Sequence, residues 1–197
     1  MNINEYQNYH ETKAHTSAEF PYNTYLCSIP LDFPGVPLHW HDELELVVIK
    51  RGQGFVSVDF DKHLVHSGDI IIIPPRCLHA IEQDDTFKME YENIIFKPDL
   101  LSSGANDLCM IQYIVPLLDG SLPIEYFLTP ALGSFEALSN CIRQIDLVCA
   151  DQTPGWQLAV KSSLFNFFFL LISERQKKTV STSSNSKSLE KMKTVLK

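Results

Sequence analysis

The sequence predicts a mainly β fold with helices behind it. Between residues 21 and 100, short runs of β-branched and aromatic residues are separated by Gly, Pro, Asp and Asn, which is the pattern of an antiparallel structure with many strands. Beyond Pro98, apolar residues recur at helical spacing instead. We therefore expect one main domain, an antiparallel β barrel or sandwich of eight short strands, followed by an α-helical hairpin.

The individual elements follow from turn residues and periodicity. Strands are expected at residues 24–28, 37–41, 44–51, 54–60, 62–66, 69–73, 79–83 and 88–96. Helices are expected at residues 107–117, 134–150 and 154–173. The third helix is indicated by Thr153, an N-cap candidate, and by Pro154, which suits the first helical position.

The third helix is more apolar than a single partner surface requires. One face is formed by apolar residues at helical spacing, yet Phe165, Phe167 and Phe169 lie outside that face. Its most apolar window, residues 164–172, is far shorter than the roughly 20 residues that span a bilayer. We therefore expect no membrane span, and a homodimer formed through the C-terminal helices.

The two ends of the chain differ from its middle. Residues 1–20 form a polar arm with no apolar run and cleavage site, so a secretory signal is not expected. The serine-rich segment within residues 176–188 is typical of a flexible linker. Residues 189–197 begin an amphipathic helix too short to fold alone. We expect them to start a further domain that is missing here, with a frayed tail as the alternative.

Charge and cysteine content narrow the class of protein. The 197 residues are 45% hydrophobic and carry a net charge of -8, and the 173 residues before Glu174 carry -13. Such an acidic surface repels phosphate backbones, so this region is not expected to bind nucleic acid itself. The five cysteines are odd in number and never spaced C-x-x-C, which favours reduced thiols and a cytoplasmic location.

One short motif contains several side chains that can bind a ligand or a metal ion. Residues 39–45 read HWHDELE and are followed by six residues and then Gly52. Because side chains alternate along a strand, His39 and His41 share one face, and Glu45 can rejoin it four residues later. The segment resembles the first cupin motif, H-x-H-x3-E-x6-G, at each position.

A second motif lies about thirty residues further on. Gly68 is followed by five residues and Pro74, and then by Arg76 and His79. This resembles the second cupin motif, with Arg76 where glycine is usual and Gln83 where asparagine is usual. The resemblance covers residues 20–100 and implies a cupin barrel, which is a double-stranded β-helix or jelly roll.

The candidate ligand-binding residues are His39, His41, Glu45 and His79. The cupin resemblance implies that they hold a divalent transition metal such as Zn, Fe, Mn, Ni or Cu, which imidazole and carboxylate ligands suit. Two other interpretations stay open: direct binding of an organic ligand in an otherwise apolar pocket, and mutual hydrogen bonding inside the barrel. No ligating role is expected for the other histidines, His10, His15, His63 and His66.

The order of segments indicates a family. A polar arm, a cupin barrel (21–100), a helical region (101–175), a serine-rich linker and a short amphipathic end resemble the AraC family of bacterial transcription regulators. The resemblance implies that a small-molecule effector, sugar-like or otherwise, binds inside the barrel, and that the helices form the dimer. It also implies that DNA is read by helix-turn-helix units beyond the linker, which are absent from this sequence.

The rival class is an enzyme. A metal-dependent cupin dioxygenase or sugar isomerase would use the same four side chains, since fold alone does not decide function. The helical hairpin, the linker and the basic amphipathic end are not needed by such an enzyme, and no separate acid–base pair is visible in motif form. We therefore expect a sensor, not an enzyme.

Overall fold

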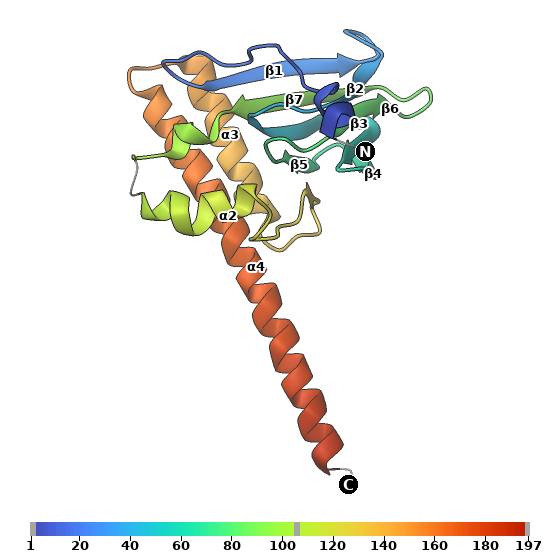
Figure 1. Cartoon of the computed structure of the whole chain (residues 1–197), viewed down its shortest axis with the longest axis vertical. Helices are drawn as coiled ribbons and strands as arrows, with labels where there is room; N and C mark the ends of the chain where they lie inside the picture. Colours follow the sequence, from blue (N-terminus) through green and yellow to red (C-terminus); the bar gives the residue numbers. More distant parts are fainter. Residues whose placement is uncertain (1–2, 105–106, 196–197) are drawn as a thin grey trace. The chain divides into compact units, whose positions relative to one another are not determined.

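The computed structural model describes residues 3–104 and 107–195, with side chains through residue 175 except at residue 4 (Figure 1). Two compact units follow one another along the chain, Met1–Leu132 and Gly133–Lys197. The first unit contains the β strands, and the second contains the two long helices. The predicted order of a β region followed by helices is confirmed.

Eight antiparallel strands form two sheets within the first unit. One sheet has the order β1 (Tyr22–Ile29), β7 (Met89–Phe96), β3 (Leu44–Val58), β5 (Ile70–Ile73) and β8 (Phe127–Leu128). The other has the order β2 (Gly35–His39), β6 (His79–Gln83), β3 again and β4 (Asp61–His66). The strands lie one beside another in Figure 1.

Strand β3 belongs to both sheets. Its first half pairs with β5 and β7, and from Gln53 onward it pairs with β4 and β6. The change falls at Gly52, where φ is +77° and a Cβ atom would lie 1.8 Å from the Lys88 carbonyl oxygen. Glycine therefore allows the strand to continue past the β7 end without a break. The prediction of two strands, 44–51 and 54–60, is wrong for this reason.

The other strand predictions are close to the observed bounds. The strand expected at 37–41 ends earlier, at His39, because Trp40 turns to pair with His10 of the arm. The two-residue strand β8 was not expected. It pairs with Ile70 and Ile71, and two residues are too few for an alternating pattern to reveal it.

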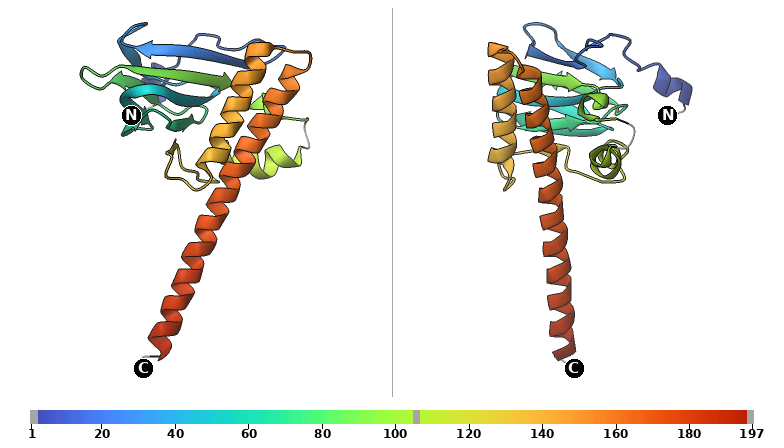
Figure 2. Two further views of the ribbon diagram at one scale, coloured as in Figure 1. Left: turned by 180° about the vertical axis from the view of Figure 1, so that it is seen from behind. Right: turned by 90° about the vertical axis from the view of Figure 1, so that its left-hand side faces the viewer.

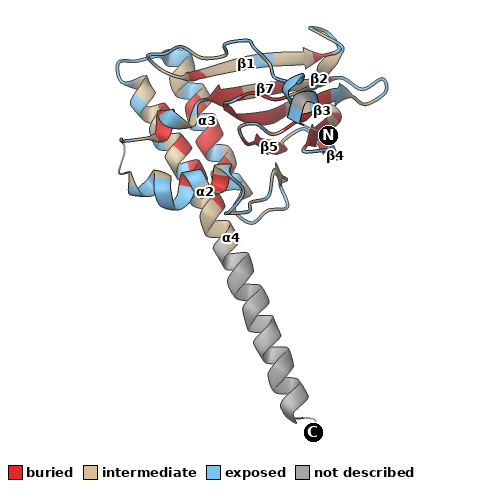
Figure 3. Cartoon of the chain, in the orientation of Figure 1, coloured by how far each residue is buried: buried red, intermediate tan, exposed pale blue. Residues whose placement is uncertain are grey.

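The core of the first unit lies between the two sheets. Apolar side chains from β1, β3, β5 and β7 meet those from β4 and β6, and the strands are accordingly the most buried part of this unit (Figure 3). The cluster consists of Ile29, Val47, Ile49, Val56, Val58, Val65, Ile71, Ile73, Ile81, Met89 and Tyr91.

Short helices complete the first unit. The arm begins with α1 (Ile3–Gln7), and a 3-10 turn follows β7 at Pro98–Leu101. The helix expected at 107–117 is present as a π-helical stretch, Met110–Ile114, that continues into α2 (Val115–Leu118).

The second unit is an antiparallel helical hairpin of α3 (Phe135–Asp151) and α4 (Trp156–Val195), side by side in both views of Figure 2. The turn uses Gln152 at φ 45° and Gly155 at φ 90°, so α4 starts at Trp156 and not at Pro154 as predicted. The helices are held together by buried apolar residues, namely Leu138, Cys141, Ile142 and Ile145 of α3 and Val160, Leu164, Phe167, Phe168 and Leu171 of α4.

Helix α4 is longer than the sequence predicts. Its backbone is helical through residues 176–188, where we expected a flexible linker. No Gly or Pro follows Gly155, and Ser or Thr costs a helix only about 0.5 kcal/mol per residue relative to Ala. The side chains after residue 175 lie outside the described part, so the roles expected for 176–188 and 189–197 stay predictions.

The first half of α4 is also long and apolar enough to cross a membrane by length and composition alone. The stretch Trp156–Arg175 has a mean hydropathy of 1.3, and 28% of it is buried in the chain. The most apolar nine residues, 164–172, are too short a stretch to show this. Core helices of proteins without membrane spans pass the same test, and one face of α4 is buried in this way.

Strand β1 carries one buried and one exposed side chain of the same size, Ile29 and Leu26, and comparing them tests where the core lies. Ile29 is fully buried, whereas Leu26 is 76% exposed. We expect Ile29→Ala to lower the free energy of unfolding by about 2–5 kcal/mol, because it removes buried methyl groups and leaves a cavity. Leu26→Ala serves as the control and should change it by less than about 0.5 kcal/mol. Urea denaturation measures both, and equal effects would contradict the assigned core.

Candidate ligand-binding site

The backbone pairing of the first unit brings the predicted site residues together. His39 is the last residue of β2 and lies opposite His79, the first residue of β6. His41 follows β2 by two residues, and Glu45 is the second residue of β3. Each side chain therefore comes from a strand or a strand end whose register is fixed by hydrogen bonds.

The three imidazoles converge. One ring nitrogen from each of His39, His41 and His79 lies within 4.8 Å of the other two. His41 and His79 are 3% and 1% exposed, and His39 is half-buried. The ring centroids of His39 and His41 lie 4.1 and 4.9 Å from that of His79. The predicted face shared by His39 and His41 is therefore present.

Glu45 is held against two of these rings. Its Oε2 atom lies 3.0 Å from His41 Nε2 and 3.5 Å from His79 Nε2. Burial alone would raise the pKa of Glu45, but its hydrogen bond with His41 and the proximity of His79 outweigh burial and lower it. Burial would likewise lower the pKa of His41, and its contact with Glu45 raises it instead. Glu45 is thus a carboxylate at neutral pH.

Backbone carbonyls orient two of the rings. The Nδ1–H groups of His39 and His79 donate to the carbonyls of Pro37 and Cys77, each at 2.9 Å. This arrangement leaves the Nε2 lone pairs free to face the centre of the cluster. In the described part of the chain, the buried Nε2 of His79 makes no hydrogen bond, and its contact with Glu45 is long. This donor set fits a divalent transition metal.

The N-terminal arm is anchored beside the cluster by Trp40. The rings of Tyr6 and His10 stack on Trp40 at centroid distances of 4.8 and 4.2 Å. Trp40 Nε1 donates to the Tyr6 carbonyl at 2.8 Å, and the Glu11 amide donates to the Trp40 carbonyl at 2.9 Å. The arm is therefore docked by both ring stacking and backbone hydrogen bonds.

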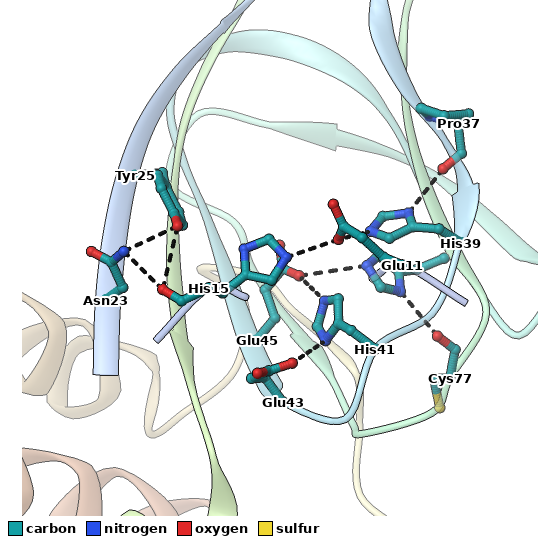
Figure 4. Close-up of polar contacts among 11 residues, drawn as sticks. Glu11, His15, Asn23, Tyr25, Pro37, His39, His41, Glu43, Glu45 and Cys77 are labelled. Atoms are coloured by element: carbon teal, nitrogen blue, oxygen red, sulfur yellow. Dashed lines mark hydrogen bonds and ion pairs between the residues drawn. The ribbon is translucent and has the colours of Figure 1, made fainter. Parts of the chain in front are cut away.

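The docked arm brings two further polar groups to the site. Glu11 Oε2 lies 2.8 Å from His15 Nε2 and 3.5 Å from His39 Nε2. The His15 ring lies 5.5 Å from that of His41, and Figure 4 shows both arm residues beside the barrel histidines. His15, for which no ligating role was expected, therefore lies beside the site, and Glu11 was missed. The one available signal was their spacing of four residues.

These residues line a cavity of about 320 Å³. That volume is at the lower end of the range for small-molecule pockets. Imidazoles and carboxylates gather on one part of its wall, and apolar groups line the rest, including Phe33, Val36, Ile81 and Ile95. The cavity can hold a small molecule, an ion, or an ion together with a small molecule. Its use by a ligand stays a prediction.

The two histidines of β4, His63 and His66, have partners outside the cavity. His63 Nε2 pairs with Asp61 at 2.9 Å, and the half-exposed His63 ring stacks on Phe127. His66 lies 4.0 Å from Asp69. Neither histidine lines the cavity.

Arg76 stands where the second cupin motif usually has glycine, and its backbone conformation is one that glycine favours. Its φ of 66° lies in the left-handed region that favours glycine, which explains why glycine is usual there. The Arg76 amide donates to the His41 carbonyl at 2.8 Å, and its guanidinium pairs with Asp42 at 2.8 Å. Arg76 thus supports the His41 turn from outside the cavity.

Two antiparallel sheets that share one strand, with histidines and a glutamate converging between them, define a cupin barrel. The chain belongs to the family of AraC-like ligand binding domains, whose pattern matches residues 25–168. The predicted family and the predicted fold class are confirmed.

Two transcriptional regulators with similar sequences support the assignment to this family. An uncharacterized HTH-type transcriptional regulator of Bacillus subtilis (strain 168), YdeC, is 32% identical over 159 residues, which are 80% of this chain and 54% of that protein. The HTH-type transcriptional activator RhaR of Mannheimia succiniciproducens is 32% identical over 69 residues, which are 35% of this chain and 24% of that protein. The chain thus spans about half or less of the length of these relatives.

Among solved structures, a cupin protein from Bacteroides fragilis is similar over 45% of this chain and 80% of its own, with 23% identity and a TM-score of 0.37.

The anchoring of the arm can be tested with two tyrosines of the same segment. Tyr6 stacks on Trp40, and its hydroxyl donates to the Arg76 carbonyl at 2.6 Å. The stack and the hydrogen bond contribute about 1 kcal/mol each, so Tyr6→Ala should raise the rate of trypsin cleavage after Lys13 about thirtyfold. Tyr9→Ala is the control, because its side chain is 37% exposed. An unchanged rate in Tyr6→Ala would contradict the docked arm.

Proposed function

We propose that this chain is the effector-sensing and dimerising part of a bacterial transcription regulator, and that a small molecule binds inside the barrel. The observation that carries the proposal is the 320 Å³ cavity on which His39, His41, Glu45 and His79 converge, in a chain of the AraC-like ligand binding family. DNA binding belongs to a helix-turn-helix domain of the kind named in the relatives, which are longer than this chain. A regulator of this kind acts in the cytoplasm.

The chemistry of the wall favours a hydroxyl-rich, sugar-like effector. Imidazoles and carboxylates offer hydrogen-bond donors and acceptors in close proximity, and apolar groups on the remaining wall cover the carbon face of a small ring. A cavity of this size holds one such molecule. The same wall accommodates a divalent transition metal, Zn, Fe, Mn or Ni, with or without an organic ligand.

The enzyme alternative rests on the same four residues, which are the ligand set of metal-dependent cupin catalysts. The named relatives are transcriptional regulators, and this supports a sensor over a dioxygenase or sugar isomerase.

Two pairs of histidines allow a matched test of the binding site. We expect at least one member of a panel of monosaccharides and divalent metal ions to raise the unfolding temperature of the full chain, because a ligand that binds the native state stabilises it. The shift should persist in His63→Ala/His66→Ala and vanish in His41→Ala/His79→Ala. Differential scanning fluorimetry of untagged protein measures it. An equal shift in both double variants would place binding elsewhere.

The dimer is proposed to form through the exposed face of α4. Leu158 and Phe169 are 73% and 64% exposed and lie eleven residues apart, which is about three helical turns. Phe165, between them in the sequence, lies at the same angular position on the helix. A second copy of the chain can cover this stripe in a two-fold interface.

A charge on this stripe should break the dimer. We expect wild-type protein to sediment as a dimer and Phe169→Glu as a monomer at the same micromolar concentration, because the introduced carboxylate would be buried in an apolar seam. Gln144→Glu, on an exposed position of α3, is the control and should remain dimeric. Analytical ultracentrifugation decides, and a monomeric wild type would refute the dimer.

A further inference from the structure

A second carboxylate faces the histidine cluster. Glu45 contacts His41 and His79, whereas Glu11 of the arm lies beside the remaining imidazole, with its Oε2 3.5 Å from His39 Nε2. The cluster is thus bordered by Glu45 and Glu43 of the barrel and by Glu11 of the arm (Figure 4). No cupin motif includes Glu11, which precedes the first strand by eleven residues.

The contacts between the two carboxylates and the imidazoles match donor separations within a single coordination sphere. Zinc and similar ions bind nitrogen and oxygen at about 2.0–2.2 Å, so neighbouring ligand atoms lie roughly 3.0 Å apart at right angles and roughly 3.4 Å apart in a tetrahedron. The two contacts of Glu45 measure 3.0 and 3.5 Å, and that of Glu11 measures 3.5 Å. The Glu11 carboxylate therefore reaches the cluster without a large movement of the arm.

The charges of the site favour a cation. The carboxylates of Glu45, Glu43 and Glu11 all lie within 3.6 Å of ring nitrogens of His41 or His39. Lys13, the cationic side chain of the cavity wall, lies over the Tyr25 ring at 5.0 Å.

The arm holds Glu11 in this position through its backbone. The Glu11 amide donates to the Trp40 carbonyl, and Trp40 is itself one residue from both His39 and His41. Binding at the histidines and docking of the arm therefore share one short segment of chain.

We propose that Glu11 is a ligand of a divalent transition-metal ion held by His39, His41, His79 and Glu45, and that metal binding and arm docking strengthen each other. The proposal shares with the proposed function only the assumption that the barrel cavity binds a ligand. The Glu11 carboxylate adds negative charge that favours a cation. Because Glu11 belongs to the arm, the arm then supplies one of the metal ligands.

The test compares two glutamates of the arm in untagged full-length protein. Zn²⁺ alone is titrated calorimetrically into wild type, Glu11→Gln and Glu19→Gln, where Glu19 is exposed and does not line the cavity. Removing one ligand should weaken binding at least tenfold in Glu11→Gln, whereas Glu19→Gln should stay within twofold of wild type. Glu11→Asp, which keeps the carboxylate, should fall between them.

Two further readouts separate a ligand from a neighbouring charge. The visible absorption spectrum of bound Co²⁺ reports its ligand set, and it should differ between wild type and Glu11→Gln but not between wild type and Glu19→Gln. Zn²⁺ should also slow trypsin cleavage after Lys13 in wild type, with little effect in Glu11→Gln. Circular dichroism establishes that each variant is folded.

Each outcome has a distinct meaning. Equal Zn²⁺ affinity and equal Co²⁺ spectra in wild type and Glu11→Gln overturn the proposal. A wild type that binds neither ion also overturns it, but leaves the proposed sensor function intact, because the monosaccharide arm of the thermal-shift panel tests that function separately. Weaker Zn²⁺ binding with an unchanged Co²⁺ spectrum would make Glu11 a positioning residue and overturn its role as a ligand.

Discussion

The passage of β3 from one sheet to the other is the constraint on which the site depends. Glu45 lies in the first half of this strand, and Val58, at its end, pairs with His79 of β6. His79 in turn lies opposite His39 of β2. A single strand therefore sets the spacing between the carboxylate and two imidazoles through backbone hydrogen bonds. The bend at Gly52 makes this possible, since a side chain there would collide with the Lys88 carbonyl.

The buried charge of Glu45 is balanced by the imidazoles that surround it. An isolated buried carboxylate costs several kcal/mol, and Glu45 offsets this cost through two imidazoles. Those imidazoles are fixed in turn, His79 by a backbone carbonyl and His41 by Glu43, whose carboxylate lies 3.6 Å from its Nδ1. The outer partners thus determine which nitrogen of each ring faces the cavity.

Much of the fold could be predicted because strand periodicity and turn residues act over short distances. The strand at 79–83 was predicted with its observed bounds, and the four motif residues do meet. What escaped prediction depends on contacts between distant segments. Glu11 reaches His39 only because Trp40 anchors the arm, and no local pattern reports a stack between residues thirty apart. Where α4 ends was mispredicted because serine-rich composition alone does not break a helix.

The position of the arm has a practical consequence for handling the protein. Residues 3–11 run beside a cavity whose donor groups are imidazoles. A polyhistidine affinity tag fused ahead of Met1 would supply further imidazoles at the same place, and would compete for any ion the cavity attracts. Metal stoichiometry measured on such a fusion would report the tag and the cavity together. The arm segment that carries Tyr6, His10 and Glu11 is therefore part of what defines the chemistry of this site.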